Sequence, residues 1–225
     1  MGTASQTTEV APRIRKVEPL SDWGMQHCIL HGVSWEAYEQ LVDDLENPHV
    51  FITYDRGIME IISPSQPHGI DEALITRLLT AYADELDIPI RSCGVVTIKR
   101  RDLRRGLEPD RCFYVKSWRE VATKPLVDFK VNPPDLAVEI EISRRLSNRR
   151  EIYAALGIPE IWLDDGRSFR VLQLRKDHSY KEVKRSLNFP DLDLAEFERF
   201  LRMWPEKSEY ELVREFRAWL RALKR

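Results

Sequence analysis

The sequence has few cysteines, no long apolar run and no excess of positive charge. Its three cysteines, Cys28, Cys93 and Cys112, are odd in number and have no CxxC spacing, which gives little sign of a disulfide framework or a zinc site. No stretch approaches the roughly 18 apolar residues that span a bilayer, and the first 20 residues lack the apolar core of a secretory signal. The net charge of -2 excludes a general basic field for nucleic acid or anionic membranes. We therefore expect a soluble, cytoplasmic protein that has no membrane partner and meets any nucleic acid through a local patch.

The length and composition indicate one main domain. With 225 residues and 43% hydrophobic content, the chain can bury one good-sized core. Residues 1–16 are polar and have nothing periodic to bury, so we expect a disordered N-terminal tail. Residues 17–190 then form the main domain, and 191–225 form C-terminal helices that pack on it.

Hydrophobic periodicity predicts an alternation of helices and strands. Ser34 is a suitable N-cap for a short helix, and a hairpin in 49–64 turns at 55–57. Helices are predicted over 68–86 and 148–157, strands over 88–100, 110–117, 133–143, 159–165 and 169–175, a charged loop over 100–109, and two helices after 191. This order is typical of an α/β domain with a mixed sheet.

One predicted strand carries an unusual number of acids. In "PPDLAVEIEIS", residues 133–143, the alternation of side chains puts Leu136, Val138, Ile140 and Ile142 on one face, and Asp135, Ala137, Glu139, Glu141 and Ser143 on the other. If the acidic face met water, the strand would be a solvated antiparallel one. The unbroken aliphatic residues between the acids favour an inner strand instead.

A further acid stands at the start of the preceding strand. In "LEPDRCFYV", Asp110 follows a proline, which suits a strand start because proline cannot donate a ladder hydrogen bond. Consecutive strands are commonly neighbours in a sheet, so we expect Asp110 and Glu139 to come together. Carboxylates gathered in this way repel unless a cation lies among them, and oxygen-rich sites suit Mg²⁺ or Mn²⁺.

Four motifs occur in an order that resembles a known family. "YDRGIMEIISPS" with His68, "LEPD", "PPDLAVEIEIS" and "YAALGIPEIW" are similar to the Uma2 family of candidate bacterial endonucleases, which belongs to the PD-(D/E)XK nuclease superfamily. The resemblance covers residues from about 33 to 165. It implies a restriction-endonuclease-like fold, in which a mixed central β-sheet is flanked by α-helices, within the domain over 17–190. It also implies Mg²⁺- or Mn²⁺-dependent hydrolysis of DNA.

The resemblance assigns roles to particular residues. Asp110 corresponds to the aspartate of the motif and Glu139 to its (D/E), so both would bind the metal. Glu141 stands where the superfamily has lysine, and it would be a further metal ligand or a base. Many members have a Lys or Arg four residues before the tyrosine of the helix, and here that residue is Arg149. The expected catalytic set is therefore Asp110, Glu139, Glu141 and Arg149.

Other residues are accessory candidates. His68, Glu72 and Lys99 could add a ligand or a basic group near the site. The densest basic run supplies a candidate nucleic-acid surface at Arg100, Arg101, Arg104 and Arg105, and a solvated loop neutralised by Asp102 and Glu108 is the alternative.

Each site residue also has a structural interpretation. Asp110 could be a turn former, Glu139 a buried structural acid, and Glu141 a salt-bridge partner of Arg144 or Arg145. Arg149 could belong to a solvated helix face, and His68 could make only a local hydrogen bond. Tyr153 and Trp162 are expected in the core.

Two other functions compete with a DNA endonuclease. The missing strand lysine favours a non-catalytic module that binds nucleic acid or protein on the same fold. RNA is an alternative substrate, because the metal chemistry barely distinguishes the two polymers. A homodimer is a further possibility, since many nucleases of this fold pair two sites, although the C-terminal helices are expected to pack on their own domain.

Overall fold

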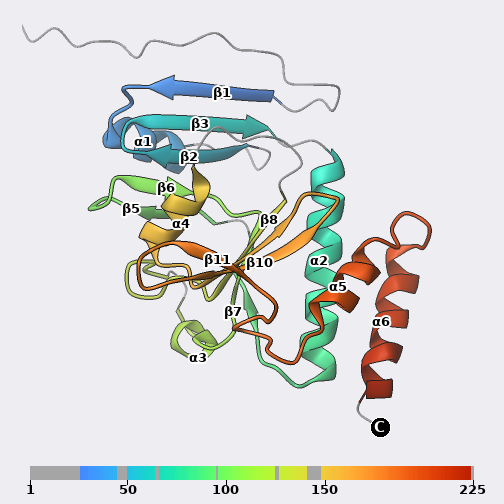
Figure 1. Ribbon diagram of the computed structural model, residues 1–225. Coiled ribbons are helices and arrows are strands. Elements are labelled where there is room, and N and C mark those ends of the chain that lie inside the picture. The colour runs from blue at the N-terminus through green and yellow to red at the C-terminus, as the bar shows by residue number, and fades with distance from the viewer. Residues whose placement is uncertain are drawn as a thin grey trace, which may run out of the picture.

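Two β-sheets and the helices around them organise the chain (Figure 1). The computed structural model describes residues 26–44, 50–63, 66–94, 96–124, 127–140 and 148–223. Within these ranges, no helix is long and apolar enough to cross a membrane. The predicted tail over 1–16 lies outside the described residues, and the predicted domain bounds stay a prediction.

The first sheet is antiparallel and has the strand order β1-β3-β2-β6-β5. Its strands are β1 (Gln26–His31), β2 (Phe51–Asp55), β3 (Ile58–Ser63), β5 (Ile98–Arg100) and β6 (Arg105–Leu107). Helix α1 (Trp35–Asp44) covers one face, where Trp35 and Tyr38 pack with Ile52, Tyr54 and Met59. The opposite face of β2 and β3 is therefore available to contact other elements of the fold.

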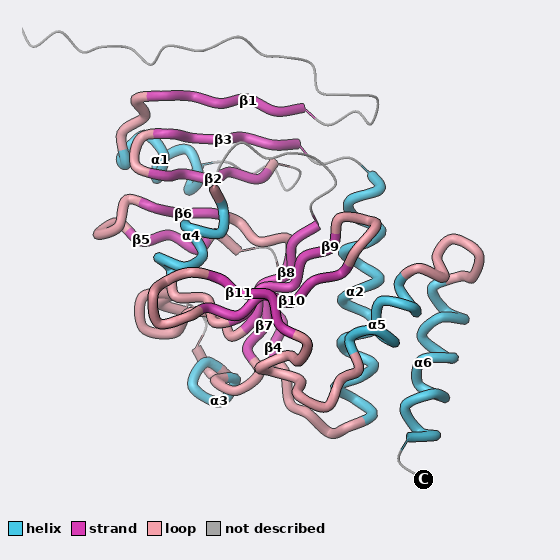
Figure 2. The backbone as a smooth tube through the Cα atoms, in the orientation of Figure 1, coloured by secondary structure: helices cyan, strands magenta, loops and turns pink. Residues whose placement is uncertain are grey.

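The second sheet is mixed and has the order β11-β10-β9-β8-β7-β4 (Figure 2). Its strands are β4 (Arg91–Ser92), β7 (Arg111–Tyr114), β8 (Leu136–Ile140), β9 (Glu160–Asp164), β10 (Phe169–Leu174) and β11 (Tyr180–Val183). Strands β8 and β9 are parallel and the other neighbours are antiparallel. The predicted α/β class with a mixed central sheet is confirmed, and β8 is an inner strand whose five residues are all buried.

Helices cover both faces of the mixed sheet. Figure 1 shows α2 (Gln66–Glu85), α5 (Leu194–Leu201) and α6 (Glu209–Leu223) together on one side. On the other side, α4 (Arg149–Leu156) packs between the mixed sheet and strands β5 and β6. A single turn of helix, α3 (Trp118–Val121), follows β7.

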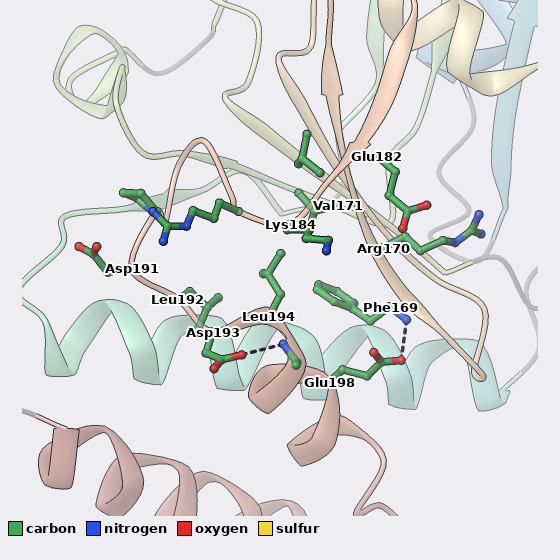
Figure 3. Close-up of a pocket in the computed structure, with 14 residues that line it drawn as sticks. Phe169, Arg170, Val171, Glu182, Lys184, Asp191, Leu192, Asp193, Leu194 and Glu198 are labelled. Atoms are coloured by element: carbon green, nitrogen blue, oxygen red, sulfur yellow. Dashed lines mark hydrogen bonds between the residues drawn. The ribbon is translucent and has the colours of Figure 1, made fainter.

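A cavity lies at the far edge of the mixed sheet, beside β10, β11 and the start of α5. It has a volume of about 640 Å³ and is lined by both basic and acidic residues, among them Arg170, Lys184 and Glu182 (Figure 3). Asp193 also lines this cavity, and it caps α5 by accepting hydrogen bonds from the backbone N–H groups of Ala195 and Glu196. None of the predicted site residues lines this cavity.

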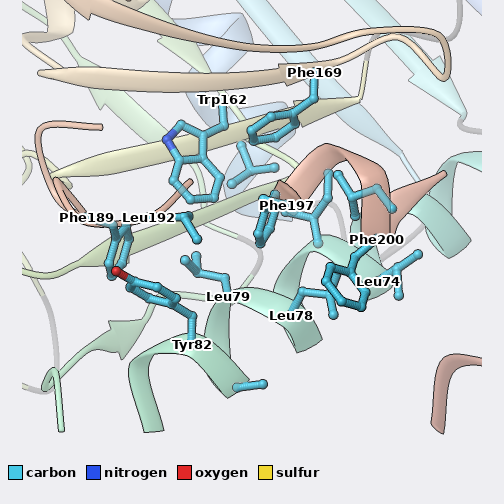
Figure 4. Packing of buried hydrophobic residues seen from close by; sticks show 14 of the residues in the cluster. Leu74, Leu78, Leu79, Tyr82, Trp162, Phe169, Phe189, Leu192, Phe197 and Phe200 are labelled. Atoms are coloured by element: carbon cyan, nitrogen blue, oxygen red, sulfur yellow. The ribbon is translucent and has the colours of Figure 1, made fainter. Parts of the chain in front are cut away.

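The main core lies between the mixed sheet and α2, α5 and α6. Figure 4 shows Trp162 surrounded by aromatic rings, with Phe169 and Phe197 centred 5.3 and 5.4 Å from it in edge-on arrangements. Burying a ring of this size stabilises a fold by about 2–3 kcal/mol. Helix α6 contributes buried Phe216 and Leu220 to the same core.

Several predicted elements are confirmed in position. Ser34 caps α1 through a 3.1 Å hydrogen bond from the Ala37 backbone N–H, and the first hairpin turns at Arg56 and Gly57. Helix α4 ends at Gly157, whose φ of 81° is the left-handed conformation that glycine adopts without steric cost.

The prediction for residues 88–117 was wrong in two respects. The expected single strand over 88–100 is two short strands, β4 and β5, which belong to different sheets. The expected loop over 100–109 contains β6, which forms a hairpin with β5. A strand of two or three residues carries too few side chains to show an alternating pattern, so neither the break nor β6 had a sequence signature. Strands β1 and β11 were also not predicted.

Candidate functional site

The two predicted metal-binding acids lie side by side at the ends of neighbouring strands. The antiparallel register pairs Arg111 with Val138, and one further step sets Asp110 opposite Glu139. The backbone N–H of Ile140 donates a 2.6 Å hydrogen bond to Asp110 Oδ2, which ties the start of β7 to the end of β8. Both acids are only 2% exposed. Opposed residues of an antiparallel pair project to the same face, so the two carboxylates share one environment.

Arg149 brings a buried cation to this pair. It is the first residue of α4, and its Nη2 lies 2.5 Å from Glu139 Oε1 and 2.8 Å from the carbonyl oxygen of Glu108. Its Nη1 donates to the hydroxyl of Thr53 on β2. Burial lowers the pKa of Arg149, but the neighbouring groups together outweigh burial, with the charge of Glu139 contributing most, and they hold that pKa above its usual value. Arg149 therefore stays charged, and the interpretation as a solvated helix residue is wrong because the side chain is buried.

Tyr153 adds a second donor to the same carboxylate oxygen. It lies one helical turn after Arg149, and its hydroxyl donates to Glu139 Oε1. Burial, followed by the charge of Glu139, raises the pKa of Tyr153 well above its usual value, so the phenol keeps its proton. Tyr153 is in the core as expected, but its polar contact was not anticipated. The four-residue spacing from Arg149, which places both on one helix face, was the available clue.

The antiparallel sheet contributes two polar residues that the sequence reasoning missed. Thr53 on β2 and Glu60 on β3 are directly opposite in register and are 2% and 1% exposed. They project from the face that Arg149 reaches, opposite to the face covered by α1. Glu60 is an acid within an aliphatic strand, "IMEIIS", which is the same kind of pattern that drew attention to Glu139.

The oxygen donors suit a hard divalent cation. Mg²⁺ is commonly held by one or two carboxylates, with water and substrate phosphate completing its shell, and Asp110 and Glu139 supply such a pair. Among the described residues, no group of three or more His, Cys, Asp or Glu side chains is arranged to hold a metal ion. Glu141 lies outside the described residues, so its predicted role as a ligand stays a prediction.

The accessory candidates lie in three different settings. Glu72 on α2 forms an ion pair with Arg111, which projects from the face of β7 opposite to Asp110. Lys99 on β5 is paired with Asp43 of α1 at 2.6 Å. His68 is within α2, but its side chain lies outside the described part of the structure. The roles proposed for these three residues stay predictions.

The basic run forms the β5–β6 hairpin, and most of its charges are paired. Arg104 is exposed at the turn, where its φ is 50°. Ion pairs join Arg100 to Asp102, Arg101 to Glu36 and Glu39, and Arg105 to Asp55. Glu108, by contrast, accepts from the Ile52 backbone and the Thr97 hydroxyl. These pairings reduce the positive field of the hairpin, and its role in binding nucleic acid stays a prediction.

Asp135, the remaining acid of the strand region, has a structural role. Its Oδ2 accepts hydrogen bonds from the backbone N–H groups of Val115 and Ser117 and from the Ser117 hydroxyl. These three bonds hold the loop after β7. Asp135 is therefore an acid close to Glu139 in the sequence that contacts the loop after β7 and not the buried acidic pair.

A comparison with models of protein families finds a match. The sequence model of the Uma2 family, described as "putative restriction endonuclease", matches residues 35–205. This range includes Asp110, Glu139, Arg149 and Tyr153 and both β-sheets except β1. No curated protein matches the chain.

Proposed function

Since the chain belongs to the Uma2 family, we propose that it is an endonuclease that hydrolyses DNA phosphodiester bonds with the help of Mg²⁺ or Mn²⁺. The observation that carries this proposal is the meeting of Asp110 and Glu139 across β7 and β8, with Arg149 against the same carboxylate. Buried carboxylates rarely occur together without a charge partner or a chemical task, and clusters of this kind favour a functional site.

Asp110 and Glu139 would hold the metal, and Glu141, which lies outside the described residues, would add a third carboxylate. A bound divalent ion supplies a water of lowered pKa and polarises the phosphate. The backbone N–H of Ile140 fixes one oxygen of Asp110, and Arg149 and Tyr153 fix one oxygen of Glu139. The chain thereby orients both ligands before any ion arrives, which avoids the cost of ordering them during binding.

Arg149 supplies from α4 a positive charge in place of the strand lysine, but it cannot perform every role of a lysine. Because a guanidinium has a pKa above 12, it cannot take a proton from water at neutral pH. It can stabilise negative charge that develops on the phosphate, through N–H groups that are already oriented. A carboxylate can act as the general base where one is needed, and Glu141 and Glu60 are the candidates. Glu60 qualifies because it is buried on the face that Arg149 reaches.

Plasmid cleavage tests this function. We expect the purified protein to nick or cut plasmid DNA with Mg²⁺ or Mn²⁺, and Asp110→Asn and Glu139→Gln to lose at least a hundredfold in rate while remaining folded by circular dichroism. Ribose-containing strands in the same assay separate a DNA from an RNA substrate. Absence of cleavage with every divalent ion on single-stranded, duplex and branched DNA would reject the proposal.

A second candidate is a binding module that has kept the fold without the chemistry. The observation in its favour is that Glu139 Oε1 already accepts from both Arg149 and Tyr153, so a metal must compete for this carboxylate. This function predicts gel-shift binding of nucleic acid that is insensitive to EDTA and to Glu139→Gln. Metal-dependent cleavage lost in Glu139→Gln would exclude it. A homodimer also stays a prediction, and sedimentation of the free protein tests it.

A further inference from the structure

Two cysteines lie opposite each other on adjacent strands, next to the acidic pair. Strands β4 and β7 pair Arg91 with Tyr114 and Ser92 with Phe113, and one more step sets Cys93 opposite Cys112. The backbone N–H of Cys93 donates a 3.0 Å hydrogen bond to the carbonyl oxygen of Cys112, so the pairing continues to this position.

This placement suits a disulfide. Directly opposite residues of an antiparallel pair have Cα atoms about 4.5–5.5 Å apart. Disulfides span Cα separations of about 4.4–6.8 Å, so a bridge here requires no large backbone movement. Both side chains project to the same face of the sheet, because opposed residues always do.

The two thiols differ in access. Cys112 is fully buried, whereas Cys93 is half-buried and lines a cavity of about 340 Å³ together with Arg91, Tyr114 and Phe129. A small oxidant can therefore reach the Cys93 thiol from the cavity, whereas the buried Cys112 thiol is accessible only to Cys93. Cys28 is also half-buried, but it lies on β1 in the other sheet.

We propose that Cys93 and Cys112 are a thiol pair that hydrogen peroxide oxidises to a reversible disulfide. The Cys93 sulfur attacks the peroxide, the O–O bond breaks, and Cys93 becomes a sulfenic acid with release of water. The Cys112 sulfur then attacks the Cys93 sulfur, the S–O bond breaks, and the leaving hydroxide takes the Cys112 proton as a second water. Two thiols lose two electrons and two protons, and one peroxide is reduced to two waters.

The disulfide would lie close to the candidate functional site. Cys112 is two residues from Asp110 and projects from the same face of β7. A link to Cys93 encloses the β5–β6 hairpin and Asp110 within one covalent loop. The inference itself stands without the proposed nuclease function, because it depends only on the geometry of β4 and β7.

Mass spectrometry of the whole folded protein tests this proposal. After treatment with a small excess of hydrogen peroxide and alkylation under denaturing conditions, we expect the free thiol count to fall from three to one, with Cys28 alkylated and a peptide linking Cys93 to Cys112. A reductant should restore all three thiols. Cys28→Ser is the matched control, and it should form the same linked peptide at the same rate.

Cys93→Ser is a second test variant, and we expect it to fold normally because Cys93 is only half-buried. We expect it to leave Cys112 as a free thiol after peroxide treatment. Oxidation of Cys93 to sulfinic acid while Cys112 stays free would overturn the proposal. A Cys28 that reacts first, or a cross-link between two chains in place of the internal one, would overturn it as well.

Discussion

Arg149 and Glu139 form a buried ion pair, with Nη2 of the arginine 2.5 Å from Oε1 of the glutamate and side-chain exposures of 9% and 3%. The two residues are ten apart in sequence and belong to the start of α4 and the inner strand β8. The pair links the mixed sheet to the antiparallel sheet, since the same guanidinium also reaches Thr53 of β2. Stability and chemistry at the site therefore depend on the same contacts.

Removing the cation should destabilise the fold. Arg149→Met leaves Glu139 buried without its ion pair, and we expect a loss of about 3–5 kcal/mol in the free energy of unfolding. Arg149→Lys keeps the charge but cannot serve the three acceptors together, so its loss should be smaller. Urea unfolding measures both. Arg150→Met is the control, because Arg150 is the exposed neighbour on the same helix; equal stability of the two methionine variants would contradict this role for Arg149.

Tyr153→Phe should affect the site more than the fold. The change removes one donor to Glu139 and should cost about 1–2 kcal/mol of unfolding free energy, while the freed carboxylate loses its fixed orientation and cleavage slows. Tyr180→Phe removes a comparable hydroxyl, which donates to the Ile158 carbonyl outside the site. It should cost similar stability with no change in cleavage rate. Equal rates in the two variants would show that the Tyr153 hydroxyl has only a structural role.

Glu85 should titrate at unusually low pH. Hydrogen bonds from Arg221 and Arg217 lower its pKa from 4.5 to about 2, and they join α6 to α2. Because the folded pKa is the lower one, the stabilisation is present above pH 4.5 and is lost as the pH falls toward 2. NMR titration of the Glu85 carboxyl should give a value near 2. In Arg217→Gln/Arg221→Gln the value should return toward 4.5, and an unchanged low pKa would refute this cause.

The sequence predicted the acidic pair for a simple reason. Alternation along a strand identifies which residues share a face, and consecutive strands tend to be neighbours. These two regularities were enough to bring Asp110 to Glu139, although they are 29 positions apart. Helix α4 and its end at Gly157 were predictable from local pattern in the same way.

The remaining part of the site depends on tertiary packing that has no local signature. Thr53 and Glu60 belong to a separate sheet, and nothing in the hairpin sequence specifies that one of its faces meets α4. The pairing of Arg101 with Glu36 and Glu39 likewise joins segments more than 60 residues apart. The run of arginines therefore indicated a basic patch, whereas in the folded protein most of these arginines form ion pairs with acidic residues.

Calorimetric titration with Mn²⁺ tests most directly whether Asp110 and Glu139 together form a metal site. We predict that the intact protein binds the ion, and that Asp110→Asn and Glu139→Gln each weaken binding at least tenfold while remaining folded. Asp135→Asn, which removes an acid held by the loop after β7, should bind the ion as the intact protein does. Equal affinity in all four proteins, or no binding in any, would contradict a shared ion at residues 110 and 139.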